Sequence, residues 1–321
     1  MKKLVSVIAL AAIAIGNCRA SAESYPTRPV TIVAPFPAGG PSDALARILS
    51  EPLRAALGQP VVIENVVGAG GNIGIGRAAR ASPDGYTLAI GQWGTHVVNP
   101  VTYSLSYDIV NDFEPIALLA NTPQLIIARK DFPANDVHEL IAWLKANPDK
   151  AMAGTVGAAG GAQIAAIYFQ QATRTRFGFV PYRGGAQVMN DLIAGQVDFM
   201  FDQAANAIAQ VRAGTIKAYA VMSGGRWRGA PDIPTIDQSG LHVSYWHELW
   251  APKGTPQHII AKLNTAVVSV LADPEVQCGY ATQGQDMWPR ELQTPQALAA
   301  WHRAEIEKWS PIITAAHLKA E

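Results

Sequence analysis

The hydrophobic pattern alternates short apolar runs with stretches whose apolar residues recur every three or four positions. The first run, 30–34, precedes a stretch in which Leu45, Ile48, Leu49 and Leu53 have helical spacing. Regular alternation of strands and helices is typical of parallel sheets and predicts an α/β fold. Further strands are predicted at 61–66, 86–90, 125–129, 152–156, 177–180, 197–201, 217–222 and 242–251, and further helices after Asn72 and at 137–146, 164–171, 256–271 and 295–316.

Four glycine pairs each follow a predicted strand and precede a predicted helix. They are Gly39-Gly40, Gly70-Gly71, Gly160-Gly161 and Gly184-Gly185. In parallel α/β sheets such loops lie at the carboxyl ends of strands, where ligands bind. Free amides at a helix N-terminus also attract anions. Any single loop reads equally well as an ordinary tight turn, but four matching loops predict one anion-binding cleft between two lobes.

The first of these loops also predicts how its helix begins. Gly40 fits the N-cap and Pro41 the first helical position, where the missing N–H of proline is tolerated. Asp43 then falls three residues after the cap, where its carboxylate reaches back to the N–H of the cap residue. We therefore interpret Asp43 as a capping residue rather than a general base.

Known nucleotide, catalytic and metal motifs are absent or misplaced. The segment 68–70 lacks the third glycine of a dinucleotide loop because position 73 is Ile73, and no Gly-Lys-Ser/Thr phosphate loop occurs. Neither a Gly-x-Ser-x-Gly nor a His-Glu-x-x-His motif is present. His96, His242 and His247 lack the spacing of metal ligands. The sequence predicts no cofactor, no metal and no catalytic residue.

Several single residues have both a binding and a structural interpretation. Trp93 and Trp246 fall at predicted loop or edge positions and either wall a pocket for a flat ligand or pack in the core. Arg183 either pairs with a carboxylate through two N–H groups or is an ordinary exposed arginine. Asp202 ends a buried strand, where it orients a loop or holds ligand-bound water.

The N-terminus has the features of an export signal. A basic start, Lys2-Lys3, precedes an apolar run over 4–16 and the small residues Ala20-Ser21-Ala22, so residues 1–22 are predicted to be a signal peptide cleaved after Ala22. Cys18 raises a lipoprotein alternative, which Asn17 before it disfavours. Cys278 is then the remaining cysteine, interpreted as a buried and inert thiol.

Charge and length restrict the partners and the domain organisation. Without the signal peptide, 22 basic residues face 25 acidic ones, and this net charge of −3 disfavours nucleic acid and anionic membranes as partners. About 300 residues suffice for two domains. We place lobe 1 at 23–121 plus 230–321 and lobe 2 at 122–229, with chain crossings at 119–123 and 223–232.

The segments 25–33 (YPTRPVTIV) and 35–43 (PFPAGGPSD) closely resemble the opening of the Bug family, the extracytoplasmic solute receptors of tripartite tricarboxylate transporters. The resemblance extends over essentially the whole mature chain. Further matching motifs are GAGGNIG at 68–74, DGYTL at 84–88, GTH at 94–96, VPYRG at 180–184, GQVD at 195–198, FD at 201–202, IPT at 233–235 and APKGTP at 251–256.

This resemblance implies a two-lobed, monomeric periplasmic binding protein that closes around one small carboxylate, held mainly by backbone amides and water. It departs from the family at 157–161, where Ala158 and Ala159 replace hydroxyl residues and Gln163 follows, and at Arg183, where lysine is common. The predicted ligand contacts, completed by neighbouring side chains of the same loops, are Phe36, Pro37, Ala38, Gly39, Gly40, Asp43, Ala69, Gly70, Gly71, Asn72, Trp93, Thr95, His96, Thr155, Gly157, Tyr182, Arg183, Gly184 and Asp202.

The functional hypothesis is a receptor that delivers its carboxylate to the permease subunits of a tripartite transporter. Trp93, His96, Trp246 and the alanine-rich loop at 157–161 favour an aromatic dicarboxylate such as terephthalate, with an aliphatic di- or tricarboxylate as the alternative. A sensor that presents its ligand to a membrane signalling protein fits the same sequence. A periplasmic hydrolase of carboxylate esters is disfavoured because the chain lacks a nucleophile motif.

Overall fold

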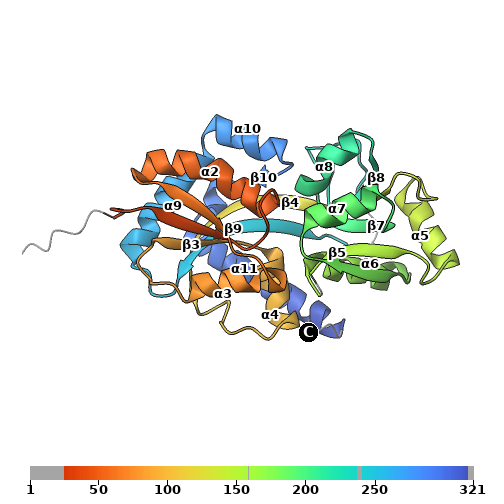
Figure 1. Cartoon of the computed structure of the whole chain (residues 1–321), viewed down its shortest axis with the longest axis horizontal. Coiled ribbons are helices and arrows are strands. Elements are labelled where there is room, and N and C mark those ends of the chain that lie inside the picture. Colours follow the sequence, from red (N-terminus) through yellow and green to blue (C-terminus); the bar gives the residue numbers. More distant parts are fainter. Residues whose placement is uncertain (1–24, 158, 237–240, 317–321) are drawn as a thin grey trace, which may run out of the picture.

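The computed structural model describes residues 25–157, 159–236 and 241–316, so the predicted signal peptide lies outside the described residues. Strands and helices alternate along most of this range, as the hydrophobic pattern predicts, and the α/β class is confirmed (Figure 1). The strands are β1 (Val30–Ala34), β2 (Val61–Asn65), β3 (Thr87–Gln92), β4 (Phe113–Arg129), β5 (Met152–Val156), β6 (Gly178–Tyr182), β7 (Phe199–Gln203), β8 (Ile216–Val221), β9 (Ser244–Pro252) and β10 (Asp286–Met287). The α-helices are α2 (Pro41–Leu57), α3 (Asn72–Ala79), α4 (Asn99–Thr102), α5 (Val137–Ala146), α6 (Gly161–Thr173), α7 (Gly185–Ile193), α8 (Ala204–Arg212), α9 (Gln257–Leu271), α10 (Pro274–Thr282) and α11 (Pro295–Ala315), and the short turns are η1 (Ala69–Gly71), η2 (Gly94–Val98) and η3 (Arg290–Leu292).

The strands form two mixed sheets that share β4. In the first sheet β2, β1 and β3 are parallel, and β9 and β4 continue it in antiparallel order. In the second sheet β6, β5 and β7 are parallel, whereas β7 and β8 both run antiparallel to β4. The parallel strands therefore form one side of each sheet, whereas β10 and β8 run antiparallel on the other side of β4, and the sequence pattern did not predict this antiparallel part.

The long strand β4 connects the two lobes. Its residues from Phe113 to Pro123 pair with β9, and its residues from Gln124 onward pair with β7. Figure 1 shows β4 and β9 running side by side through the middle of the molecule. The change of partner lies next to the predicted crossing at 119–123.

Helices cover both faces of each sheet. On one face of the first sheet, Leu45 and Leu49 of α2 pack with Leu263 and Val267 of α9. The other face is covered by α3 and by α11, which contributes Trp309. The second sheet is covered by α7 and α8 on one face and by α5 and α6 on the other (Figure 1). Each lobe is thus a three-layer arrangement of one sheet between two layers of helices.

Several local predictions need correction. The helix after the second glycine pair is capped by Gly71, and Asn72 is its first residue rather than its cap. The helices α8 and α10 were not predicted, and β4 begins at Phe113 rather than at Leu125. Cys278 lies on the outer side of α10 and is exposed, so the prediction of a buried thiol is wrong.

Candidate functional site

A cavity of about 140 Å³ lies where the two sheets meet, bounded by loops from both lobes. Residues at the N-terminal ends of α2, α6, α7 and α8 line it; for α8 these are the cap residue Gln203 and Asn206. Its lining comprises Phe36, Pro37, Ala38, Gly40, Pro41, Ser42, Gly70, Gln92, Gly94, Asn99, Gln124, Val156, Gly160, Gly161, Ala162, Gly184, Gly185, Ala186, Gln187, Phe201, Asp202, Gln203, Asn206 and Tyr245.

Seven residues of the predicted site line this cavity together. They are Phe36, Pro37, Ala38, Gly40, Gly70, Gly184 and Asp202. Three of the four glycine pairs deliver a helix N-terminus to the cavity, and the pair at 70–71 contributes Gly70. Because the unpaired amides of a helix start carry partial positive charge, these ends form a surface suited to an anion.

The first loop is held by Asp43, which does not line the cavity itself. Its carboxylate accepts hydrogen bonds from the Gly39 N–H, the Arg47 Nε and the Asn65 Nδ2, each at 2.9 Å. Burial by itself would raise the pKa of Asp43, but these hydrogen bonds and the Arg47 charge lower it. The bonded amide is that of Gly39, one residue before the predicted cap, so Asp43 fixes the loop rather than closing the helix end.

The second loop is built from residues with positive φ. Gly68, Ala69, Gly70 and Gly71 have φ values of 129°, 47°, 64° and 97°. A side chain at Gly71 would approach Thr95 Cγ2 to 2.8 Å, so both the backbone conformation and the space favour glycine. Ala69 and Gly71 support the loop without lining the cavity.

Asn72 stabilises the same loop through hydrogen bonds. Its Oδ1 accepts hydrogen bonds from Asn99 Nδ2 at 2.7 Å and from Tyr107 Oη at 3.2 Å. Asn99 Nδ2 also donates to the Gly70 carbonyl at 3.0 Å. Asn99, which lines the cavity, therefore connects the loop to the turn that follows β3.

The two lobes approach each other closely at the cavity mouth. A Cβ atom built on Gly184 would lie 3.3 Å from Pro37 Cγ, and one on Gly157 would lie 3.7 Å from the Cα of Gly70. Gly157 and Thr155 do not line the cavity; the Thr155 hydroxyl lies 3.5 Å from the Gly157 carbonyl. The glycines at these positions allow the loops of the two lobes to come into contact.

Asp202 is the one acidic side chain among the described lining residues. It is 7% exposed and accepts hydrogen bonds from its neighbour Gln203 N–H at 2.8 Å and from Asn206 Nδ2. Burial raises the pKa of Asp202 to about 7. The lining as described contains no lysine, arginine or histidine. An anion here would be bound by neutral donors and helix ends.

Glutamines and a tyrosine in the lining were missed by the sequence reasoning. Gln92 and Gln203 are the last residues of β3 and β7, and Gln124 interrupts the apolar run of β4. A polar residue at the end of a buried strand, or within one, is the sequence feature that could have identified these glutamines. Only Asp202 was predicted from that feature. Tyr245 follows the first residue of β9, and its hydroxyl lies against Gly161.

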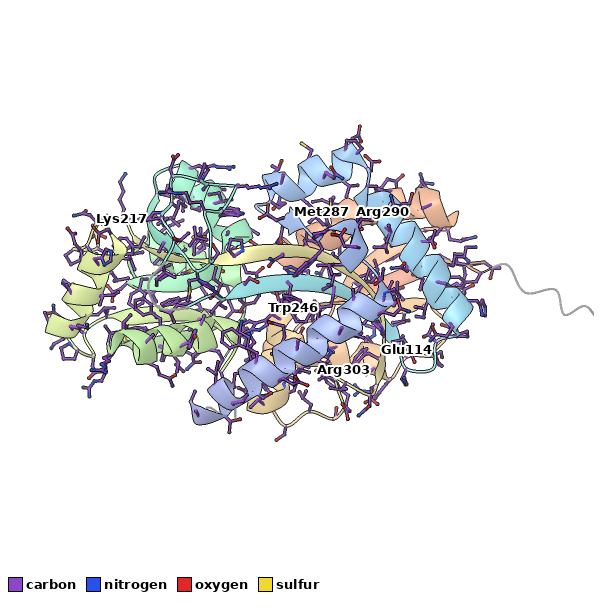
Figure 2. All side chains as sticks on the ribbon, turned by 180° about the vertical axis from the view of Figure 1, so that it is seen from behind. Glu114, Lys217, Trp246, Met287, Arg290 and Arg303 are labelled. Atoms are coloured by element: carbon purple, nitrogen blue, oxygen red, sulfur yellow. The ribbon has the colours of Figure 1, made fainter. Side chains whose placement is uncertain are left out.

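Trp93 and Trp246 do not wall the pocket, which corrects the flat-ligand prediction. Both side chains are completely buried and outside the cavity lining. Trp93 packs edge-on against Tyr245 and Trp309, with ring centroids 5.2 and 5.0 Å apart. Figure 2 shows Trp246 on β9 where α11 crosses the sheet, and its Nε1 donates to Glu305 Oε2 at 3.3 Å.

His96 and Thr95 belong to the core behind the cavity, which corrects their prediction as ligand contacts. The His96 ring is completely buried, stacks on Trp250 at 5.3 Å and has Nδ1 3.2 Å from Glu248 Oε1. Burial and the neighbouring His302 lower its pKa well below the usual range, so the ring is neutral. The Thr95 hydroxyl bonds the Gln92 carbonyl at 3.0 Å and stabilises the turn after β3.

Tyr182 and Arg183 also lie outside the cavity lining. The Tyr182 hydroxyl donates to Asp191 Oδ2 at 2.7 Å, and burial together with this carboxylate raises the pKa of Tyr182 to about 12. Arg183 is exposed at the turn before α7. The paired interaction of Arg183 with a carboxylate therefore has no support in this arrangement.

No group of three or more histidine, cysteine or acidic side chains in the described residues is arranged to hold a metal ion. None of the described helices combines the length and apolar character needed to cross a membrane.

Known proteins are similar to this chain in sequence and fold. The family model described as "Tripartite tricarboxylate transporter family receptor" (TctC) matches residues 45–318. The structure of the periplasmic binding protein BugD is similar, with a TM-score of 0.87 and 39% identity over 92% of this chain and all of that one. MatC (Rpa3494) from Rhodopseudomonas palustris with bound malate has a TM-score of 0.85 and 35% identity over 90% of this chain and all of MatC. R. palustris Rpa4515 with adipate has a TM-score of 0.86 and 31% identity over 92% of this chain and 99% of the other.

Proposed function

The chain belongs to the tripartite tricarboxylate transporter receptor family, and from this membership we propose that it captures a small organic carboxylate between its two lobes. The observation that carries the proposal is the cavity itself, which four helix N-termini line and in whose described lining no cationic side chain occurs. Helix ends and neutral donors bind carboxylates without a fixed counter-charge.

The ligand we propose is an aliphatic carboxylate, a class that includes the dicarboxylates bound by two similar proteins. MatC carries malate and Rpa4515 carries adipate, both of which are aliphatic dicarboxylates. Terephthalate was favoured because Trp93, His96 and Trp246 were expected in the cleft, and all three side chains are completely buried outside its lining. These three side chains therefore no longer support an aromatic ligand, and that alternative rests on the alanine-rich loop at 157–161 alone.

We propose that the protein is exported, that Ala22 ends its signal peptide, and that the closed form delivers the ligand to permease subunits of a tripartite transporter. Closure would turn the lobes 23–121 plus 230–321 and 122–229 about β4 and β9. The changes of strand partner at Gln124 and the approach of Pro37 to Gly184 support such a hinge. No covalent chemistry is part of this function.

Isothermal titration of the chain from Glu23 onward tests the proposal with malate, succinate, adipate, citrate, terephthalate and butyrate. We expect micromolar or tighter binding of at least one aliphatic carboxylate and weaker binding of terephthalate. Absence of binding by every carboxylate would overturn the receptor function. Preference for terephthalate would overturn only the aliphatic assignment.

A matched pair of variants tests closure. Gly184→Val places methyl groups against the Pro37 ring, so we expect at least a tenfold loss of affinity with the fold retained. Gly225→Val is the control because a Cβ atom there meets nothing within 4 Å. Equal affinities of the two variants would contradict the closure of the lobes at this contact.

A further inference from the structure

Three glutamine side chains form a cluster on the inner wall of the cavity. Gln92, Gln124 and Gln203 come from β3, β4 and β7, and all three line the cavity. Gln203 Nε2 donates to Gln92 Oε1 at 3.2 Å, which links the first sheet to the second. We call these three residues the glutamine subsite.

The backbone of Gln124, the middle residue of this subsite in the sequence, is held by hydrogen bonds at both its N–H and its carbonyl. Its N–H donates to the Val243 carbonyl at 3.2 Å, and its carbonyl accepts from the Met222 N–H at 2.7 Å. It lies directly opposite Gln203 in the antiparallel pair of β4 and β7. Opposed residues of such a pair project to the same face, so the two amides are neighbours at the cavity.

The amides of this subsite have unused hydrogen-bonding capacity. The Gln124 side chain is completely buried, and neither its Oε1 nor its Nε2 has a partner among the described residues. Gln203 Oε1 is buried without a partner in the same part of the structure. Buried amides are costly when unpaired, so a ligand that completes them gains affinity from each new bond.

The chemistry of the unused atoms restricts the group that fits. Amide side chains offer both donors and acceptors, whereas an ionised carboxylate only accepts hydrogen bonds. The Gln203 Nε2 already bonds Gln92, so a carboxylate placed here would leave the free Gln203 Oε1 without a donor, and no cation in the described lining would compensate its charge. A carboxamide or a hydroxyl group can donate to the free oxygens and accept from the Gln124 Nε2.

We infer that the glutamine subsite binds a neutral group of the ligand that both donates and accepts hydrogen bonds. The ligand class is therefore a carboxylate with a carboxamide or hydroxyl group at its far end, and its carboxylate lies at the helix N-termini. This inference rests on the proposed function, since it requires that a carboxylate is bound in the cavity.

Titration with matched ligands tests the inference on the chain from Glu23 onward. The pairs are succinamate against succinate and glutaramate against glutarate, in which a carboxamide replaces one carboxylate at the same chain length. We expect the half-amide to bind at least tenfold more tightly in one pair. Equal or tighter binding of the diacid in both pairs would overturn the subsite while leaving the receptor function intact. Failure of all four ligands and of every carboxylate in the first titration series would overturn both.

The variant Gln124→Met assigns the effect to the subsite, because methionine keeps the length of the side chain and removes the amide. We expect it to lose the preference for the half-amide and to unfold at a higher temperature without ligand, since an unpaired buried amide is removed. Gln257→Met, at the exposed start of α9, is the matched control and should keep the preference. Retention of the preference in Gln124→Met would overturn the assignment.

Discussion

The two faces of the β3–β9 strand pair have opposite roles although they carry similar residues. On one face Gln92 and Tyr245 line the cavity. On the other, Trp246 and Glu248 lie under α11, with His96 3.2 Å from Glu248. Successive residues of a strand point to opposite faces, so Tyr245 and Trp246 are separated by parity alone. Burial of a polar or aromatic residue therefore does not identify a ligand contact unless its face is also known.

Alanine substitutions of two glycines are expected to separate the faces most strongly. A Cβ atom on Gly91 would overlap the His96 ring and Glu248 Oε1, so we expect Gly91→Ala to lower the free energy of unfolding by about 3 kcal/mol. At Gly94 the nearest atom would be Gln92 Nε2 at 3.7 Å, and we expect a stability within about 1 kcal/mol of wild type. Because Gly94 lines the cavity, its variant should instead lose affinity. Urea denaturation and titration of both variants measure this, and equal destabilisation would remove the distinction between the faces.

Asp43 differs from Asp202 and Glu248 because its buried carboxylate accepts hydrogen bonds from three donors, one of them a charged arginine. Asp43→Ala removes hydrogen bonds from Gly39, Arg47 and Asn65, and we expect a loss of about 2 kcal/mol in the free energy of unfolding. Since its folded pKa is lowered, its contribution is present above the unfolded pKa of 3.8 and is lost as pH falls through the folded value. Urea denaturation at pH 7 and below pH 3 checks this. A loss of equal size at both pH values would contradict the role of the ionised carboxylate.

The pH dependence of stability distinguishes the carboxyl groups of the two faces. Burial raises the pKa of Glu248 well above its usual range and that of Asp202 to about 7. A raised folded pKa makes stability fall as pH rises, by about 1.4 kcal/mol per pH unit between the unfolded and folded values. Glu248→Gln should therefore remove a decline that begins at about pH 4.5. Asp202→Asn should remove one that begins near pH 3.8 and ends at about pH 7.

Denaturation of wild type and both variants from pH 5 to pH 9 without ligand provides the measurement. The stability of wild type relative to each variant should fall as pH rises above pH 5, and for Asp202→Asn this fall should end at about pH 7. A difference that stays constant from pH 5 to pH 9 for either variant would contradict the raised pKa of that carboxyl group.

The glycine loops were predictable because strand, glycine pair and helix follow one another in the sequence. Gly40, Gly70 and Gly184 came from that pattern, and Asp202 came from its place at the end of a buried strand. The antiparallel pairing of β9 with β3 and β4 depends on contacts across more than 100 residues, which no local pattern records. Without that pairing the parity of β9 was unknown. Trp246 was therefore placed at the site, and Tyr245 and the glutamines were not.

The placement of β9 also has a consequence for how the chain is made. The strands β7 and β8 pair with β4 from Gln124 onward, and together with β5 and β6 they lie between residues 152 and 221, so the second sheet can assemble as soon as this segment is available. The first sheet must wait for β9, which pairs with β3 from more than 150 residues further along the chain. During synthesis or export, β3 is therefore an open edge that a chaperone would have reason to cover. The first lobe therefore begins first in the sequence but is the last to complete its sheet.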